Sequence, residues 1–136
     1  MSIEDQIQRL STIYYNEILT KNTRNILLTG RKCQPHIIYT FLGFELKSGR
    51  KRINCPDINT ARYLKIFSEL GMPSIKIPYN PTQINQVLSE LEQILESIKK
   101  LLLAEKLDKK QHQLKLRKLY KEIRTQLRQS EIQTKT

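Results

Sequence analysis

Apolar residues in the first part of the chain recur with the spacing of an amphipathic helix. They stand three or four positions apart, at Ile3, Ile7, Leu10, Tyr14 and Ile18. Side chains at this spacing lie on one face of an α-helix. We expect this helix to begin after Ser2, where Asp5 completes a capping box, and to end near Lys21.

Short β-branched and aromatic runs follow, which are typical of strands. Residues 25–29 predict one strand, and residues 37–47 predict a longer one. Gly43, in the middle of the longer run, indicates a bulge or a close backbone contact. Ser48 and Gly49 then make a tight turn into a third strand, so the longer run and its successor are predicted to form a β-hairpin.

Helix signals return after this hairpin. Asn59 or Thr60 can cap a helix whose end is marked by Gly71, a residue suited to the C′ position. Residues 74–79 then alternate between apolar and polar side chains, which predicts a short strand. Pro78 places this strand at a sheet edge or at the strand's end, because proline has no amide hydrogen to donate.

The clearest helix start is Asn80 followed by Pro81, a capping residue with proline at the first helical position. The helix after it carries an apolar heptad seam, formed by Ile84, Leu88, Leu91, Leu95, Ile98 and Leu102. Such a stripe must be covered, and the candidates are the small sheet, a folded-back C-terminal helix or a second chain. Glu90, Glu92 and Glu96 flank the seam and would match an antiparallel basic helix.

The seam is interrupted after Leu102 and resumes at Leu116. A single continuous helix would be about 70 Å long, which is unusual for a monomeric domain. We favour a turn near residues 107–113, because Asp108 with Gln111 can cap a second helix there.

The pattern as a whole predicts an α+β fold, a small sheet with a β-hairpin packed by helices and followed by a long C-terminal helix or helical hairpin. Residues 1–80 are expected to form a small α/β core with the hairpin. Residues 81–136 form the helical segment, which is heptad-seamed at first and basic afterwards. We expect one domain overall, since 136 residues is a typical domain size.

Positive charge is concentrated in two blocks. The chain has 24 Lys and Arg against 13 Asp and Glu, a formal net charge of +11. Residues 21–52 hold eight basic residues and a single acid, Glu45, and residues 99–136 hold twelve basic and four acidic residues. The stretch 81–98 between them is acidic. Polyanions are the natural partners of such a chain, nucleic acid first among them.

We therefore expect a non-enzymatic protein that binds DNA or RNA through the basic hairpin and the basic C-terminal helix. The candidate phosphate contacts are Arg31, Lys32, Lys47, Arg50, Lys51, Arg52, Lys110, Arg117, Lys121, Arg124 and Arg128. Tyr39, Phe41 and Phe44 lie in the same ribbon, and a basic two-stranded ribbon can enter a groove or grip the backbone of nucleic acid. The alternative is a protein-interaction module or homo-oligomer in which the seam pairs with a partner helix.

A second alternative rests on a resemblance. Glu45-Leu46-Lys47 has the E-x-K spacing of the PD-(D/E)xK nucleases, and the predicted order of helices and strands is similar to their core. In that family an earlier acidic residue completes a Mg²⁺ site. This chain has no Asp or Glu between Glu17 and Glu45, so the resemblance implies an inactive relative.

Other chemistry is not indicated. His36 and His112 are far apart and lack a neighbouring carboxylate, and the two cysteines have no zinc-site spacing. We expect no metal and no cofactor. The sequence has no apolar run of transmembrane length, so we expect no membrane partner and a reducing compartment, the cytoplasm or an organelle interior.

Overall fold

The computed structural model describes residues 1–28 and 34–134 and has the expected α+β fold. Its elements in chain order are α1 (Ile3–Ile13), the π-helical turn η1 (Tyr14–Ile18), β1 (Thr23–Leu27), β2 (His36–Thr40), β3 (Gly43–Ser48), β4 (Lys51–Cys55), α2 (Ile58–Glu69), β5 (Ser74–Pro78), α3 (Pro81–Leu103) and α4 (Lys109–Thr134).

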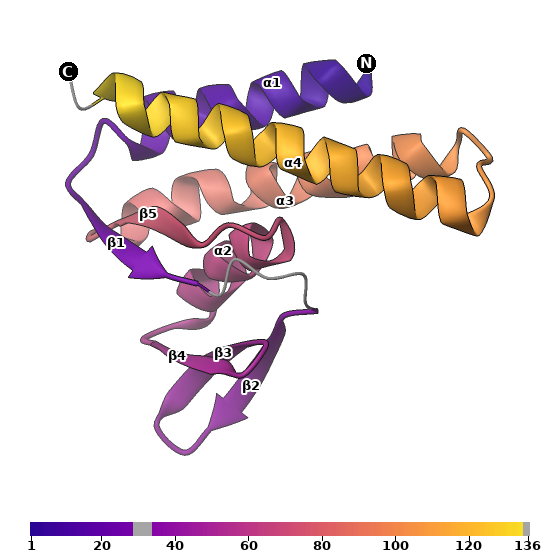
Figure 1. Cartoon of the computed structure of the whole chain (residues 1–136). Coiled ribbons are helices and arrows are strands. Elements are labelled where there is room, and N and C mark those ends of the chain that lie inside the picture. Colours follow the sequence, from indigo (N-terminus) through magenta and orange to yellow (C-terminus); the bar gives the residue numbers. More distant parts are fainter. Residues whose placement is uncertain (29–33, 135–136) are drawn as a thin grey trace.

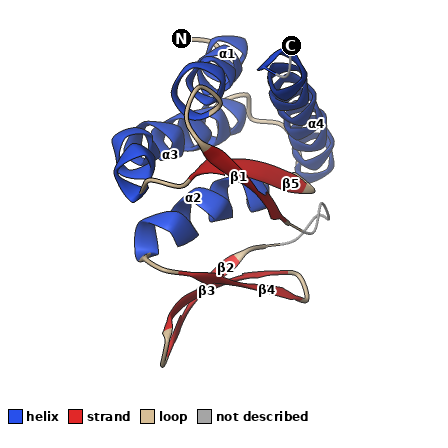
Figure 2. Ribbon diagram, turned by 90° about the vertical axis from the view of Figure 1, so that its left-hand side faces the viewer, coloured by secondary structure: helices blue, strands red, loops and turns tan. Residues whose placement is uncertain are grey.

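The elements are stacked in layers (Figures 1 and 2). Helices α1, α3 and α4 lie at one end, and the β1–β5 sheet and α2 lie in the middle. The β2–β3–β4 sheet lies at the other end, beyond α2. We expected one small sheet, but the described strands divide into two antiparallel sheets. The chain segment between the paired strands β1 and β5 therefore contains the whole β2–β3–β4 sheet and α2.

Two of the predicted helix boundaries are confirmed by their hydrogen bonds. Ser2 and Asp5 form a capping box at the start of α1. Gly71 lies just past the end of α2 with φ +82, and the Met72 amide donates to the Phe67 carbonyl at 3.1 Å. This 6→1 hydrogen bond identifies a Schellman motif. The residue at position C′ of this motif has a left-handed backbone conformation, which glycine adopts most easily.

A third boundary, the start of α3, is also as predicted, while the start of α2 is not. Asn80 Oδ1 accepts from the Thr82 amide at 3.0 Å. The cap of α2 is Asp57, whose Oδ1 accepts from the Thr60 amide at 2.7 Å. Asn59 and Thr60 both lie inside the helix, because the extended backbone of Asp57 brings its carboxylate over the free amides of the first turn.

The prediction of one strand over residues 37–47 is wrong. This segment contains two strands, β2 and β3, joined by a tight turn at Phe41 and Leu42. Gly43 begins β3 with φ +129, so it is a turn residue and not a bulge. The turn needs one residue with a left-handed backbone conformation, and Gly43 adopts it. The two turn positions can therefore hold the large apolar residues Phe41 and Leu42.

The break between the last two helices is confirmed. Helix α3 ends at Leu103 and α4 begins at Lys109, slightly earlier than predicted. Asp108 Oδ1 accepts from the Gln111 amide at 2.8 Å, which is the expected cap. Figure 1 shows α4 returning across the molecule, so α3 and α4 form a helical hairpin.

The heptad seam of α3 is buried inside the chain. Its residues, Ile84, Leu88, Leu91, Leu95, Ile98 and Leu102, all belong to one core cluster. The main cover of α3 is α1 and α2, which were not among the three covers we had considered. The folded-back C-terminal helix α4, which was one of the three, adds Leu119, Ile123 and Leu127 to the same cluster. No helix in the described part of the chain is long and apolar enough to cross a membrane.

A buried polar network fastens the end of α4 to the core. Tyr14 Oη donates to Glu131 Oε1 at 2.6 Å and accepts from the Lys76 amide at 3.1 Å. Tyr63 Oη donates to the Lys76 carbonyl at 2.7 Å. Burial is the main cause that raises the pKa of both tyrosines far above its ordinary value. Both hydroxyls therefore stay protonated and act as donors.

Candidate nucleic-acid interface

Helix α2 covers only one face of the β2–β3–β4 sheet (Figure 2). Leu46 and Ser48 of β3 are buried on that inner face, where the Ser48 and Ser68 hydroxyl oxygens lie 2.5 Å apart. Because side chains alternate along a strand, Glu45 and Lys47 point to the opposite, outer face. On this outer face Arg52 is exposed while Glu45 and Lys47 are half-buried, and the face forms the first part of the candidate interface.

Basic side chains stand next to one another on this outer face. Lys47 is the cross-strand neighbour of both His36 and Arg52. Like charges in directly opposed positions repel each other in a sheet. Glu45 offsets part of this repulsion, since its Oε2 lies 3.7 Å from Arg52 Nη1, but the Arg52 side chain is still 63% exposed. An anion placed over Lys47 and Arg52 would lower the repulsion further.

The remaining hairpin candidates are placed less uniformly. Arg50 is exposed in the turn between β3 and β4. Lys51 is opposite Ser48, so it lies on the inner face, at the end of the sheet, and is half-buried. Arg31 and Lys32 lie outside the described residues.

Helix α4 supplies the second part of the candidate interface. Lys110, Arg117, Lys121 and Arg128 are exposed and follow one another at intervals of seven, four and seven residues, which places them in one stripe along the helix. Arg128 forms an ion pair with Glu131 at 3.4 Å. The other three basic residues have no ion pair with any described residue, so their charge is available to a ligand.

Arg124 belongs to the same stripe by its position but has a different environment. Its guanidinium Nη1 donates to the Leu70 carbonyl at 2.7 Å, and its side chain covers Gly71. Arg124 therefore stabilises the end of α2 and is not a free cation. The same contact turns this side of α4 toward α2, beyond which lies the β2–β3–β4 sheet.

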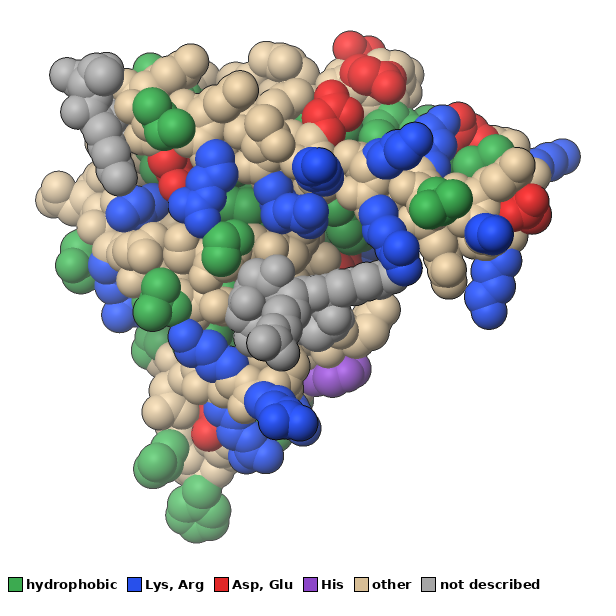
Figure 3. All heavy atoms as spheres, in the orientation of Figure 1, with side chains coloured by type: hydrophobic (Ala, Val, Ile, Leu, Met, Phe, Trp, Pro, Cys, Tyr) green, Lys and Arg blue, Asp and Glu red, His purple; other side chains and the backbone are tan. Residues whose placement is uncertain are grey.

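The outer face of the β2–β3–β4 sheet points away from α2, but its basic side chains can be seen together with those of α4 from one side of the molecule (Figures 2 and 3). Figure 3 shows Lys and Arg side chains gathered over α4 and over the β2–β3–β4 sheet in a single view. We call this surface the basic face and define it by Lys47, Arg50, Arg52 and the α4 stripe of Lys110, Arg117, Lys121 and Arg128. The sequence does not reveal this relationship, because Arg52 and Lys110 are 58 positions apart.

The acidic residues of α3 do not neutralise the basic face, contrary to our expectation of an antiparallel charge match with the C-terminal helix. Glu90 pairs with Arg9 of α1 at 2.8 Å, and Glu96 pairs with Lys99 of its own helix at 3.7 Å. Glu92 pairs with Arg62 of α2. The reason is that α3 turns these carboxylates toward α1 and α2 and not toward α4.

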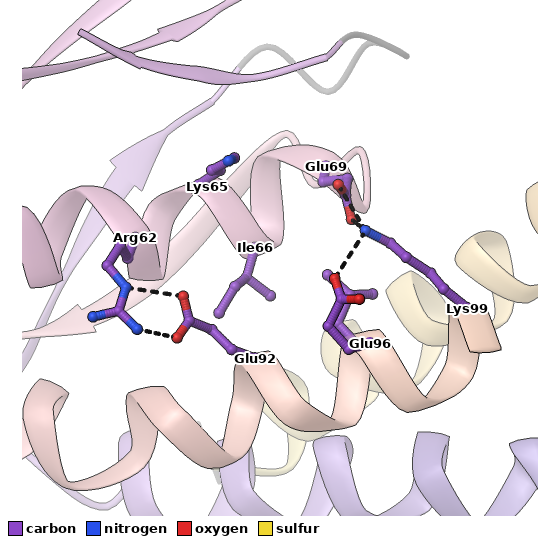
Figure 4. Close-up of a pocket in the computed structure, with 8 residues that line it drawn as sticks. Arg62, Lys65, Ile66, Glu69, Glu92, Glu96 and Lys99 are labelled. Atoms are coloured by element: carbon purple, nitrogen blue, oxygen red, sulfur yellow. Dashed lines mark hydrogen bonds and ion pairs between the residues drawn. The ribbon is translucent and has the colours of Figure 1, made fainter. Parts of the chain in front are cut away.

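A groove of about 370 Å³ between α2 and α3 is lined by such pairs. Figure 4 shows Arg62 facing Glu92, and Lys99 lying between Glu69 and Glu96. Arg62 Nε donates to Glu92 Oε2 at 3.0 Å, and Lys99 Nζ lies 2.8 Å from Glu69 Oε2. This hydrogen bonding raises the pKa of Arg62. Most of the charge in the groove is balanced internally, so the groove joins two helices and offers little to a ligand.

The structure does not supply the features that the nuclease resemblance implies. Strand β3 carries Glu45 and Lys47 on one face as expected, but the nearest charged partner of Glu45 is Arg52. Among the described residues, no group of three His, Cys, Asp or Glu side chains lies close enough to hold a metal ion. The strands that would form one nuclease-like core are divided between two sheets.

The seam residues proposed for protein interaction are also accounted for. Leu91, Ile98 and Leu102 are fully buried, and the other three seam residues nearly so. Their apolar surface is used in packing α3 against α1 and α2. A partner helix could reach the seam only if the core opened.

Sequence reasoning missed one exposed feature of the sheet. Tyr39, Phe41 and Leu42 are strongly exposed at the end of the β2–β3 hairpin. We had grouped the aromatic residues with the basic residues of the ribbon, yet the turn at Phe41 and the turn at Arg50 lie at opposite ends of β3. The absence of Gly, Asn, Asp or Pro at the turn itself hid it from the sequence pattern.

No family model, no curated protein and no solved structure matches the chain. Any functional assignment must therefore come from the charges, exposure and contacts of the residues themselves.

Proposed function

We propose that this protein binds nucleic acid without catalysing a reaction, through the basic face formed by the β2–β3–β4 sheet and α4. The observation that carries the proposal is the exposed stripe of Lys110, Arg117 and Lys121, whose charges have no counter-ion among the described residues. Unpaired cations aligned along one direction suit a ligand with regularly spaced anions, which is the form of a phosphate backbone.

The dimensions of the stripe agree with such a ligand. Lys110 and Arg128 are separated by 18 positions of a continuous helix, or about 27 Å at about 1.5 Å per residue. Along the axis of a duplex, the phosphates of one strand advance by about 3.4 Å each, so the length of the stripe matches the rise of about eight of them. The sheet adds Lys47, Arg50 and Arg52 at a second position on the same face.

The chemistry of these contacts favours affinity over sequence selectivity. Lys and Arg bind phosphate oxygens by charge-assisted hydrogen bonds, and such contacts position a protein without reading bases. The guanidinium groups of Arg50, Arg52 and Arg117 can bind two phosphate oxygens at once. We therefore expect weak sequence preference and a steep dependence on salt.

Measurement of affinity against salt concentration tests the proposal. The logarithm of the affinity for a duplex should fall linearly with the logarithm of salt, by close to one unit for each phosphate neutralised. Lys121→Ala should weaken binding and reduce the magnitude of this slope by about one. Lys65→Ala is the matched control, because Lys65 is exposed in the groove between α2 and α3, and it should leave affinity and slope unchanged.

Two results would contradict the proposal. The first is an absence of binding to both duplex and single-stranded probes at about 50 mM salt, where electrostatic contacts of this kind are strong. The second is equal weakening by Lys121→Ala and Lys65→Ala, which would assign the affinity to net charge and not to the basic face.

A further inference from the structure

We propose that the β2–β3 turn is a stacking element that contacts unpaired bases, so that the ligand of the basic face is a single-stranded nucleic acid. This inference rests on the proposed function and adds the class of ligand to it. Its starting point is the turn itself, where Phe41 is fully exposed and Leu42 almost so. Figure 3 shows hydrophobic side chains at the projecting end of the sheet, on the same face as the basic residues.

The tip is an ordered structure. Thr40 and Gly43 close the turn as a strand pair, and the Leu42 amide donates to Thr40 Oγ1 at 3.3 Å. Tyr39 lies opposite Phe44, and their rings meet edge to face with centroids 5.2 Å apart. The Tyr39 ring is thus held in place by Phe44 on the inner face of the sheet, the face of Leu46, while Phe41 stands free at the turn. Ordered rings lose little conformational entropy on binding.

The tip is suited to bases because of its size and its neighbourhood. Three side chains present far less surface than the roughly 800 Å² per partner that a stable protein interface buries. A nucleobase is a flat apolar surface of the size of one ring, and stacking on aromatic side chains is a common mode of single-strand binding. The basic outer face of the same sheet would hold the phosphates of that strand.

The geometry also suggests how the strand lies. The basic residues Lys47 and Arg52 and the apolar tip are at different ends of β3, which has six residues and is therefore about 20 Å long. A strand bound along the outer face would contact phosphates at one end and place bases at the other. A duplex keeps its bases stacked inside and cannot offer them to the tip without distortion.

A tryptophan reporter tests this inference on the full chain, which has no natural Trp. In the Phe41→Trp variant, a single-stranded oligothymidylate of about 12 nucleotides, within known site sizes, should quench the emission on binding. The double variant Phe41→Ala/Leu42→Ala should bind this probe on the order of tenfold more weakly. Its affinity for a duplex should not change. Leu103→Ala is the matched control, since Leu103 is 65% exposed at the end of α3, and it should not affect either probe.

The other outcomes separate this inference from the proposed function. If the double variant binds both probes as the unchanged protein does, while Lys121→Ala weakens binding, the tip inference is overturned and the basic face stands. If the unchanged protein binds neither probe, both proposals fall. A blue shift in the emission of the Phe41→Trp variant with vesicles of anionic lipid, without quenching by the oligonucleotide, would overturn the tip inference in favour of a membrane surface.

Discussion

Arg124 and Leu70 are 54 positions apart, yet Arg124 Nη1 donates to the Leu70 carbonyl at 2.7 Å. Leu70 is the last half-helical residue of α2, where carbonyl groups lack partners within the helix. The contact brings a cation to the negative end of the helix dipole. It fixes the relation between α4 and α2, and through α2 the relation between the two parts of the basic face.

Arg124→Ala should lower the free energy of unfolding by about 1–3 kcal/mol, because a charge-assisted hydrogen bond to a half-buried carbonyl is lost. Thermal unfolding followed by circular dichroism measures the effect. Lys121→Ala, an exposed change on the same helix, should leave the melting temperature nearly unchanged. Equal melting temperatures for the two variants would show that the contact contributes nothing to stability.

Tyr14→Phe should destabilise the protein by about 1–3 kcal/mol, since it leaves both Glu131 and the Lys76 amide without their hydroxyl partner. The ring itself still fits the core, so packing is kept. Tyr15→Phe changes the next residue, which is partly exposed, and serves as the control in the same chemical denaturation experiment. A loss of stability in both variants would assign the effect to the π-helical turn and not to the network.

Alkaline pH should unfold the protein cooperatively. Burial raises the pKa of Tyr14, Tyr63 and Tyr120, so the folded state keeps protons that the unfolded state releases above its ordinary tyrosine pKa of about 10. The stabilisation is complete below that pH and is lost as the pH rises through the folded-state values, by up to about 1.4 kcal/mol per pH unit for each tyrosine.

A titration followed by tyrosinate absorbance and circular dichroism checks this expectation. The absorbance of the buried tyrosines should rise together with the loss of helix signal. Tyr14→Phe should make the pH dependence less steep, because one of the linked protons is removed. Ionisation of all six tyrosines before any loss of helix would contradict the assignment.

Leu91→Asp with Leu95→Asp should prevent folding. Both side chains belong to the core cluster, and an unpaired carboxylate buried there costs more than most domains can lose. Leu103→Asp, on the exposed side of the same helix, should leave the circular dichroism spectrum unchanged. If the double variant stayed folded and only its mass in solution decreased, the seam would join two chains and would not pack against α1 and α2.

The boundaries that sequence reasoning predicted well are those set by local hydrogen bonds. Asn80 with Pro81, Gly71, and Asp108 with Gln111 each act within a few residues of the chain, so their pattern alone indicates a helix end. The seam of α3 was predicted for a similar reason, since helical spacing is a local property. Its cover was not, because the choice among α1, α2, α4 and a sheet depends on tertiary packing.

The features that were missed depend on contacts between distant residues or on an atypical turn. Arg117, Arg124 and Arg128 are indistinguishable by spacing, and only the position of the α2 carboxyl end shows that Arg124 is engaged. The strand break at Phe41 was missed because the turn positions hold apolar residues and the glycine stands one step later. The candidate site was therefore predicted as a set of charges, while its shape required the structure.

The Tyr14–Glu131 hydrogen bond spans 117 positions, and this has a consequence for the chain during its synthesis. A ribosome adds about 5–20 residues per second, so Tyr14 waits roughly 6–23 s for its carboxylate to be made. During that interval Leu119, Ile123 and Leu127 have not yet joined the core cluster. A nascent chain that has completed α3 but not α4 therefore carries an open apolar surface on the helical layer, which only the later arrival of α4 closes.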